Sequence, residues 1–123
     1  MARDYTKIKA WQFADELALL VYKATKEFPK SEIWGLTSQM RRAAVSVPAN
    51  IVEGSARKNR KEYLQFLYIA ISSLTELSYY IRFTRELEYL DGSTYEELWA
   101  KCQECLRTLQ GLISYVERQT SDL

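Results

Sequence analysis

The sequence predicts an all-α fold, in which a single domain over residues 1–123 forms an antiparallel, up-down-up-down four-helix bundle. Three observations predict it. The chain contains only four glycines and two prolines among 123 residues, which argues against a β-sandwich or barrel. Four segments repeat apolar residues at alternating three- and four-residue steps, the spacing of an α-helix. The segments between them are short, so consecutive helices must run antiparallel.

The first predicted helix spans about residues 7–28 and ends at FPKSEIWG, where proline and glycine interrupt the pattern. The second spans about residues 37–55. It contains Pro48, which removes the helical partner of the Ala44 carbonyl and predicts a kink at a cost of about 3 kcal/mol. The two apolar seams are Trp11, Ala14, Ala18, Val21, Thr25 and Phe28, then Leu36, Met40, Ala43, Val47, Ile51 and Gly54.

The third predicted helix spans about residues 60–90 and the fourth about residues 94–118. Capping boxes are expected to open both, Asn59 with Glu62 and Ser93 with Glu96. The apolar seams are Leu64, Leu67, Ile71, Leu74, Leu77 and Ile81, then Leu98, Cys102, Cys105, Leu109, Leu112 and Val116.

More apolar side chains are present than a monomeric bundle needs to bury. They extend around more than half of the third helix and also occur off the seams of the first two helices. Because such surplus apolar surface is typical of subunit contacts, the sequence predicts a homo-oligomer. The residues concerned are Tyr63, Phe66, Ile69, Tyr80 and Leu87, together with Val45, Val52 and Leu19.

A polar stripe runs along the second helix beside its apolar seam, and two interpretations of it are open. One is a site shared at a subunit or ligand contact. The other, which we favour, is that Arg42 and Asn50 form hydrogen bonds to the third helix, with Glu76 as the expected partner, and so fix the register of the bundle. The stripe consists of Gln39, Arg42, Ser46, Asn50, Glu53 and Arg57.

Basic residues are concentrated in one part of a chain whose net charge is only +1. Between residues 39 and 61 there are six of them (Arg41, Arg42, Arg57, Lys58, Arg60 and Lys61) against one acid, Glu53. Four of the six form a loop before the third helix, whose N-terminal amides would add to the attraction for phosphate. Arg57, Lys58, Arg60 and Lys61 are therefore candidate nucleic-acid contacts, and Arg41 is a weaker one because it lies off the polar stripe.

The sequence contains no pattern that indicates catalysis, a metal or another cofactor. Histidine is absent, and no glycine-rich phosphate loop is present. Cys102 and Cys105 form a C-x-x-C pair, but they lie on an apolar seam and are expected to be core residues. No apolar run of bilayer length and no signal peptide are found, so a cytoplasmic protein is expected.

The run FPKSEIWGLTSQMRRAAVSVPANIVEGSARKNRKEYLQFLYIAISSLTEL closely resembles the bacterial four-helix-bundle family encoded in intervening sequences of 23S rRNA genes, the S23 or IVS proteins. The resemblance implies a ring-like homo-oligomer, typically a pentamer. It also implies kinship with accessory proteins of diversity-generating retroelements, which bind nucleic acid and a reverse transcriptase. The family pattern includes Gln39, Arg41, Arg42, Ser46, Pro48, Asn50, Glu53, Gly54 and Glu76, and it assigns none of them a biochemical role.

The leading hypothesis is a non-enzymatic, cytoplasmic homo-oligomer that binds RNA or DNA through basic residues displayed around a ring. The alternative is a protein–protein adaptor that docks a nucleic-acid enzyme such as a reverse transcriptase. The adaptor hypothesis predicts that Val45→Asp or Leu19→Asp disrupts partner or subunit contacts.

Overall fold

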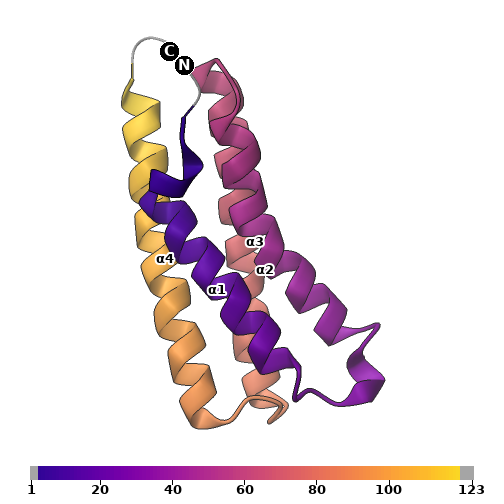
Figure 1. Ribbon diagram of the computed structural model, residues 1–123. Helices are drawn as coiled ribbons and strands as arrows, with labels where there is room; N and C mark the ends of the chain where they lie inside the picture. Colours follow the sequence, from indigo (N-terminus) through magenta and orange to yellow (C-terminus); the bar gives the residue numbers. More distant parts are fainter. Residues whose placement is uncertain (1–2, 120–123) are drawn as a thin grey trace.

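A computed structural model describes residues 3–119 and contains four α-helices: α1 (Lys9–Thr25), α2 (Leu36–Ser55), α3 (Arg60–Glu86) and α4 (Gly92–Arg118). Two short 3₁₀ helices, η1 (Tyr5–Lys7) and η2 (Lys30–Glu32), precede α1 and α2. The connection between α2 and α3 lies at one end of the bundle with both chain ends, and the other two connections lie at the opposite end (Figure 1). In the described part of the chain, α1 and α3 each pack against α2 and α4 but not against each other. The predicted up-down-up-down bundle is confirmed.

The core consists of the predicted seams. Their members are buried apart from Trp11, Leu36, Ile71 and Leu112, which are half-buried, and Ile113 lies in the core of α4 as well. Thr25 is a polar member of the seams, and it donates its hydroxyl to the Val21 carbonyl at 2.8 Å. The periodicity of apolar residues therefore determines which face of each helix is turned inward.

Both ends of α1 differ from the prediction. Residues 5–7 form η1, which is capped by the Asp4 carboxylate, so α1 begins only at Lys9. The helix ends at Thr25 and not at Phe28, because Pro29 disfavours a helical conformation in the residue before it. Phe28 is nevertheless buried, with its ring centroid 5.4 Å from that of Tyr89.

α2 continues through Pro48, which is itself buried.

The third helix ends at Glu86, four residues before the predicted end. A Schellman motif terminates it: the Tyr89 amide donates to the Thr84 carbonyl and the Glu88 amide donates to the Arg85 carbonyl, each at 2.9 Å. Glu88 occupies the left-handed position of this motif, with φ of 64°. Glycine is the residue that usually adopts this conformation, because a side chain there is sterically disfavoured.

Glu88→Gly is therefore expected to stabilise the protein by about 1 kcal/mol, because glycine relieves the strain of the left-handed conformation. In thermal unfolding this corresponds to an increase in Tm of roughly 4 °C. A suitable control is Arg82→Gly, at an exposed position one turn before the end of α3, where glycine is expected to destabilise the helix by a similar amount. A Glu88→Gly protein that unfolds at a lower temperature than the wild type would contradict this account.

The cap of α4 is also displaced from its predicted position. Asp91, not Ser93, accepts the capping hydrogen bond, from the Thr94 amide at 2.7 Å. That bond lowers the pKa of the Asp91 carboxyl from its usual value. A carboxylate at the N-terminus also complements the helix dipole, so Asp91 is a better cap than the serine two residues later. The Asn59 cap of α3 is confirmed, because its side chain accepts from the Glu62 amide at 2.8 Å.

Candidate nucleic-acid interface

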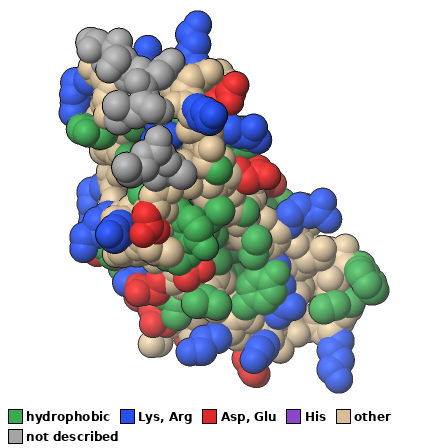
Figure 2. Space-filling view, turned by 45° about the horizontal axis from the view of Figure 1, so that its top comes forward, with side chains coloured by type: hydrophobic (Ala, Val, Ile, Leu, Met, Phe, Trp, Pro, Cys, Tyr) green, Lys and Arg blue, Asp and Glu red, His purple; other side chains and the backbone are tan. Residues whose placement is uncertain are grey.

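The four basic residues predicted to contact phosphate lie together at the end of the bundle where α2 passes into α3. We refer to Arg57, Lys58, Arg60 and Lys61 as the basic loop. Arg57, Lys58 and Lys61 are exposed and Arg60 is half-buried. Figure 2 shows Lys and Arg side chains at this end of the molecule.

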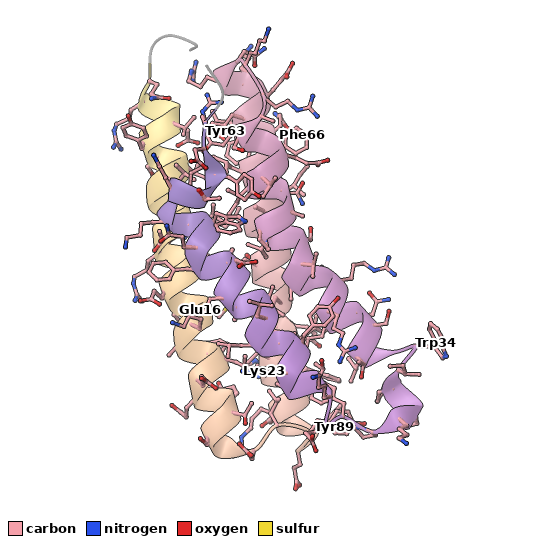
Figure 3. The ribbon with its side chains drawn as sticks, in the orientation of Figure 1. Glu16, Lys23, Trp34, Tyr63, Phe66 and Tyr89 are labelled. Atoms are coloured by element: carbon pink, nitrogen blue, oxygen red, sulfur yellow. The ribbon has the colours of Figure 1, made fainter. Side chains whose placement is uncertain are left out.

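A close approach of α2 and α3 holds the base of the basic loop. Gly54 is buried in the last turn of α2. A β-carbon at this position would lie 2.8 Å from the Phe66 Cβ, which is closer than side chains tolerate, and 3.0 Å from the Tyr63 Cδ1, which is a tight contact. Figure 3 shows Tyr63 and Phe66 on α3 at this end of the bundle. Glycine therefore lets the two helices pack tightly one turn before the loop begins.

Two arginines rest on the aromatic side chains at this junction. The Arg57 guanidinium lies 4.8 Å from the centre of the Phe66 ring, and that of Arg3 lies 4.1 Å from the centre of the Tyr63 ring. Arg3 also donates a hydrogen bond to the Arg57 carbonyl at 2.6 Å. Burial raises the pKa of the Tyr63 hydroxyl, and the nearby Arg3 charge opposes this shift. The aromatic contacts position both guanidinium groups, and the N–H groups that Arg3 does not use on the Arg57 carbonyl, together with those of Arg57, can reach a phosphate.

Arg3 was not predicted from the sequence, because 54 residues separate it from Arg57. It brings the local cations to five, with the carboxylates of Asp4, Glu53 and Glu62 as the nearby acids in sequence. The expected help from the α3 amides is smaller than predicted, because the Asn59 side chain already occupies the Glu62 amide. The electropositive character of this end therefore rests on side chains more than on the helix N-terminus.

Arg41 lies apart from the basic loop. Arg57 follows it by sixteen positions, most of them in α2, which corresponds to about 24 Å along a helix axis. Its Nε donates to the Thr25 Oγ1 at 2.7 Å and its Nη2 to the Tyr22 carbonyl at 3.4 Å, and its guanidinium lies 4.7 Å from the centre of the Tyr22 ring. Arg41 is thus anchored to α1 at the other end of the bundle.

The polar stripe of α2 connects to α3 through Ser73, and the expected contact with Glu76 is wrong. The hydroxyls of Ser46 and Ser73 are 2.8 Å apart, and the Asn50 amide donates to the Ser46 hydroxyl at 3.0 Å and carbonyl at 2.8 Å. Glu76 instead accepts from the Tyr80 hydroxyl at 3.2 Å.

The other members of the stripe do not take part in this network. Gln39, Arg42 and Glu53 are exposed and form no side-chain hydrogen bond or ion pair with the described residues. Part of the stripe therefore joins two helices, and part of it remains available at the surface.

Cys102 and Cys105 lie in the core, as predicted. Burial raises the pKa of the Cys102 thiol to about 11 and that of Cys105 to about 12. Both thiols therefore stay protonated at neutral pH, which is the state of packing residues with little nucleophilic character. Over residues 3–119 no cluster of three or more His, Cys, Asp or Glu side chains is placed to hold a metal ion. In the same range, no helix combines the length and apolar character that a bilayer crossing requires.

Comparison with known proteins agrees with the fold and the sequence pattern. A family model described as 23S rRNA-intervening sequence protein matches residues 6–111. The chain belongs to this family. The crystal structure of a protein of unknown function from the S23 ribosomal protein family of Bacteroides thetaiotaomicron has a similar fold, with a TM-score of 0.75 and 22% sequence identity over 85% of this chain and 97% of that one. No curated protein matches the chain.

Proposed function

We propose that this 23S rRNA-intervening sequence protein is a non-enzymatic, cytoplasmic homo-oligomer that binds RNA or DNA through its basic loop. The observation that supports it is the cluster of cations at one end of the bundle, where Arg3 and Arg57 are held on aromatic rings. Phosphate backbones are recognised by such clusters without regard to base sequence, so the proposed binding is general and not sequence-specific.

Oligomerisation would make this binding effective. Four or five cations on one protomer give weak, salt-sensitive affinity, because each neutralised phosphate contributes little alone. Identical loops on several protomers can bind one nucleic acid at the same time, and linked binding raises the overall affinity by about 10² to 10⁴ without new contacts.

Two exposed apolar surfaces support self-association, and they lie on different sides of the bundle. The first, the α1–α2 face, is formed by Leu19 and Val45. Leu19 is 62% exposed, and Val45 lies one turn from Arg41, on the side of α2 that contacts α1. Figure 2 shows hydrophobic side chains gathered in the lower half of one face, with charged side chains of both signs around them.

The second surface, the α3 stripe, is formed by Ile69, Tyr79, Phe83 and Leu87, which are exposed on the outer side of α3. Tyr79 and Phe83 stack with ring centroids 5.7 Å apart. Of the other surplus apolar side chains identified in the sequence, Phe66, Tyr80 and Val52 are half-buried, and Tyr63 is buried within the bundle. Two different surfaces favour a head-to-tail contact, which closes into a ring when the rotation per subunit allows it.

The alternative function is a protein–protein adaptor that docks a nucleic-acid enzyme such as a reverse transcriptase. The same exposed apolar side chains favour it, because aromatic residues surrounded by charge are typical of the centres of protein interfaces. In that case the basic loop would have no role in affinity for nucleic acid.

A salt titration tests the proposed function. Binding of labelled structured RNA and duplex DNA is measured by fluorescence anisotropy, on protein whose mass has been determined by light scattering. Replacing Arg57, Lys58, Arg60 and Lys61 with alanine is expected to reduce the slope of log K against log salt by about 3 to 4 per protomer for duplex DNA, since each lost phosphate contact reduces it by about 0.9. At low salt the affinity is expected to fall on the order of 100-fold.

The matched control removes four exposed cations elsewhere, by replacing Lys7, Lys9, Arg82 and Arg107 with alanine, and changes the net charge equally. It is expected to retain most of the affinity. An equal loss in the control would show that net charge, not the basic loop, determines binding. An assembled wild-type protein that binds neither nucleic acid near physiological salt would favour the adaptor.

A further inference from the structure

A groove without acidic residues lies at the end of the bundle opposite the basic loop. It runs from the end of α1, past η2, to the first turns of α2, and consists of two adjoining hollows of about 430 and 450 Å³ that share Ile33, Thr37 and Arg41. These volumes are in the range of small-molecule sites. Four cations line it, Lys26 and Lys30 in one hollow and Arg42 in the other, with Arg41 between them.

The wall of the groove at the N-terminus of α2 presents unpartnered polar groups. Thr37 is only 2% exposed, yet it lines both hollows, and its hydroxyl has no hydrogen-bond partner among the described residues. The neighbouring Ser38 hydroxyl and the backbone N–H groups of both residues are likewise without a partner in the described chain. The Glu32 carboxylate accepts from the Leu36 amide through one oxygen and from the Tyr89 hydroxyl through the other. The amides of Thr37 and Ser38 therefore remain able to donate to an anion.

Trp34 extends from the rim of the same groove. Its side chain is 89% exposed, and Figure 3 shows it pointing away from the bundle at the corner between η2 and α2. Tyr22 lies in the groove beside it, with the Arg41 guanidinium over its ring. A large aromatic ring in water next to fixed cations is the arrangement by which proteins stack an unpaired base and hold its phosphate.

We propose that this groove binds single-stranded RNA or DNA, with a phosphate at the first turn of α2, contacted by Arg41, Arg42 and the Thr37 hydroxyl, and a base stacked on Trp34. This extends the proposed function to a second site and to unpaired strands. Charge selects the occupant: the lining has four cations, no carboxylate and several hydrogen-bond donors. A hydrophobic helix from a protein partner would find few aliphatic contacts there, because most of the lining residues of the Trp34 hollow are polar or aromatic.

Trp34→Ala tests the groove without threatening the fold, since its side chain is exposed. Affinities for a labelled oligouridine, for an abasic strand of the same length and for a duplex are measured by fluorescence anisotropy. The variant is expected to weaken oligouridine binding by roughly 5- to 150-fold, the range of one lost base stack, and to change abasic and duplex binding by less than about twofold. Trp34→Phe is expected to retain most of the affinity.

Arg42→Ala separates the phosphate contact from the stacking contact. It is expected to reduce the salt slope for the single strand by about 0.7, whereas Trp34→Ala leaves that slope unchanged. Tyr115→Ala, the truncation of an exposed aromatic side chain on α4 outside the groove, is expected to have no effect on strand binding.

The proposal is overturned if Trp34→Ala leaves oligouridine binding unchanged or weakens duplex binding equally. It is also overturned if the variant changes the mass of the oligomer, because a second copy of the chain would then cover the groove. The experiments distinguish the two proposed sites. If the Trp34 variant loses single-strand binding and the basic-loop variant binds fully, the proposal for the groove is supported and the proposal for the basic loop is contradicted.

Discussion

Replacing Gly54 with alanine is expected to lower the free energy of unfolding by about 1 to 2 kcal/mol, although alanine is the better helix former. The new β-carbon would lie 2.8 Å from the Phe66 Cβ and 3.3 Å from the Tyr63 carbonyl oxygen. Neither atom can move away by a simple rotation, because one is the root of a side chain and the other belongs to the α3 backbone. The helices must therefore separate at this point, and the loss of packing outweighs the gain in helix propensity.

Gly111→Ala is the matched control for this prediction. It makes the same substitution inside α4, where no atom lies within 4 Å of the new β-carbon. Only helix propensity acts there, so Gly111→Ala is expected to raise the free energy of unfolding by about 0.5 to 1 kcal/mol. Urea denaturation of the two variants should therefore give changes of opposite sign. A Gly54→Ala protein as stable as the Gly111→Ala protein would show that the α2–α3 contact is loose.

The Gly54 contact also links the fold to the proposed function. Gly54 lies three residues before Arg57, the first residue of the basic loop, and the Arg57 guanidinium lies over the Phe66 ring. Separating the two helices displaces that ring relative to the loop. Gly54→Ala is therefore expected to weaken nucleic-acid binding as well, whereas Gly111→Ala is not.

The bundle could be predicted from the sequence because apolar spacing is a local property. The predicted seams are the buried faces, and Asn59 marks the start of α3 correctly. Helix ends were less accurate where several capping residues compete. The chain offers both Asp91 and Ser93 before α4, and only the conformation of the turn selects Asp91.

The contacts between distant segments could not be predicted. Nothing in the sequence distinguishes Ser46 and Ser73 from the other serines, and only the bundle places their hydroxyls 2.8 Å apart. Arg3 contacts Tyr63 because the N-terminal segment lies against the α2–α3 junction. The position of Trp34 is a different case. It lies in the segment that was recognised as a helix break, but its near-complete exposure depends on how η2 turns into α2.

Introducing a charge into either exposed apolar surface is expected to abolish self-association. Leu19→Asp alters the α1–α2 face and Ile69→Asp alters the α3 stripe, and Val45→Asp is expected to act like Leu19→Asp. All three side chains are exposed in the protomer, so the fold should persist. An aspartate at the centre of a desolvated contact weakens it on the order of 100-fold or more, because the carboxylate loses its water without gaining a partner. Light scattering is expected to find each variant as a monomer.

Mixing the two variants determines how the surfaces pair. In a head-to-tail assembly, the intact α3 stripe of the Leu19→Asp chain fits the intact α1–α2 face of the Ile69→Asp chain, and both remaining surfaces are defective. The mixture is therefore expected to form a one-to-one dimer that cannot grow. If each surface instead pairs with itself, each variant alone should remain a dimer through its unaltered surface. A variant that keeps the mass of the wild-type oligomer would exclude its surface from the assembly and leave it available to a different protein.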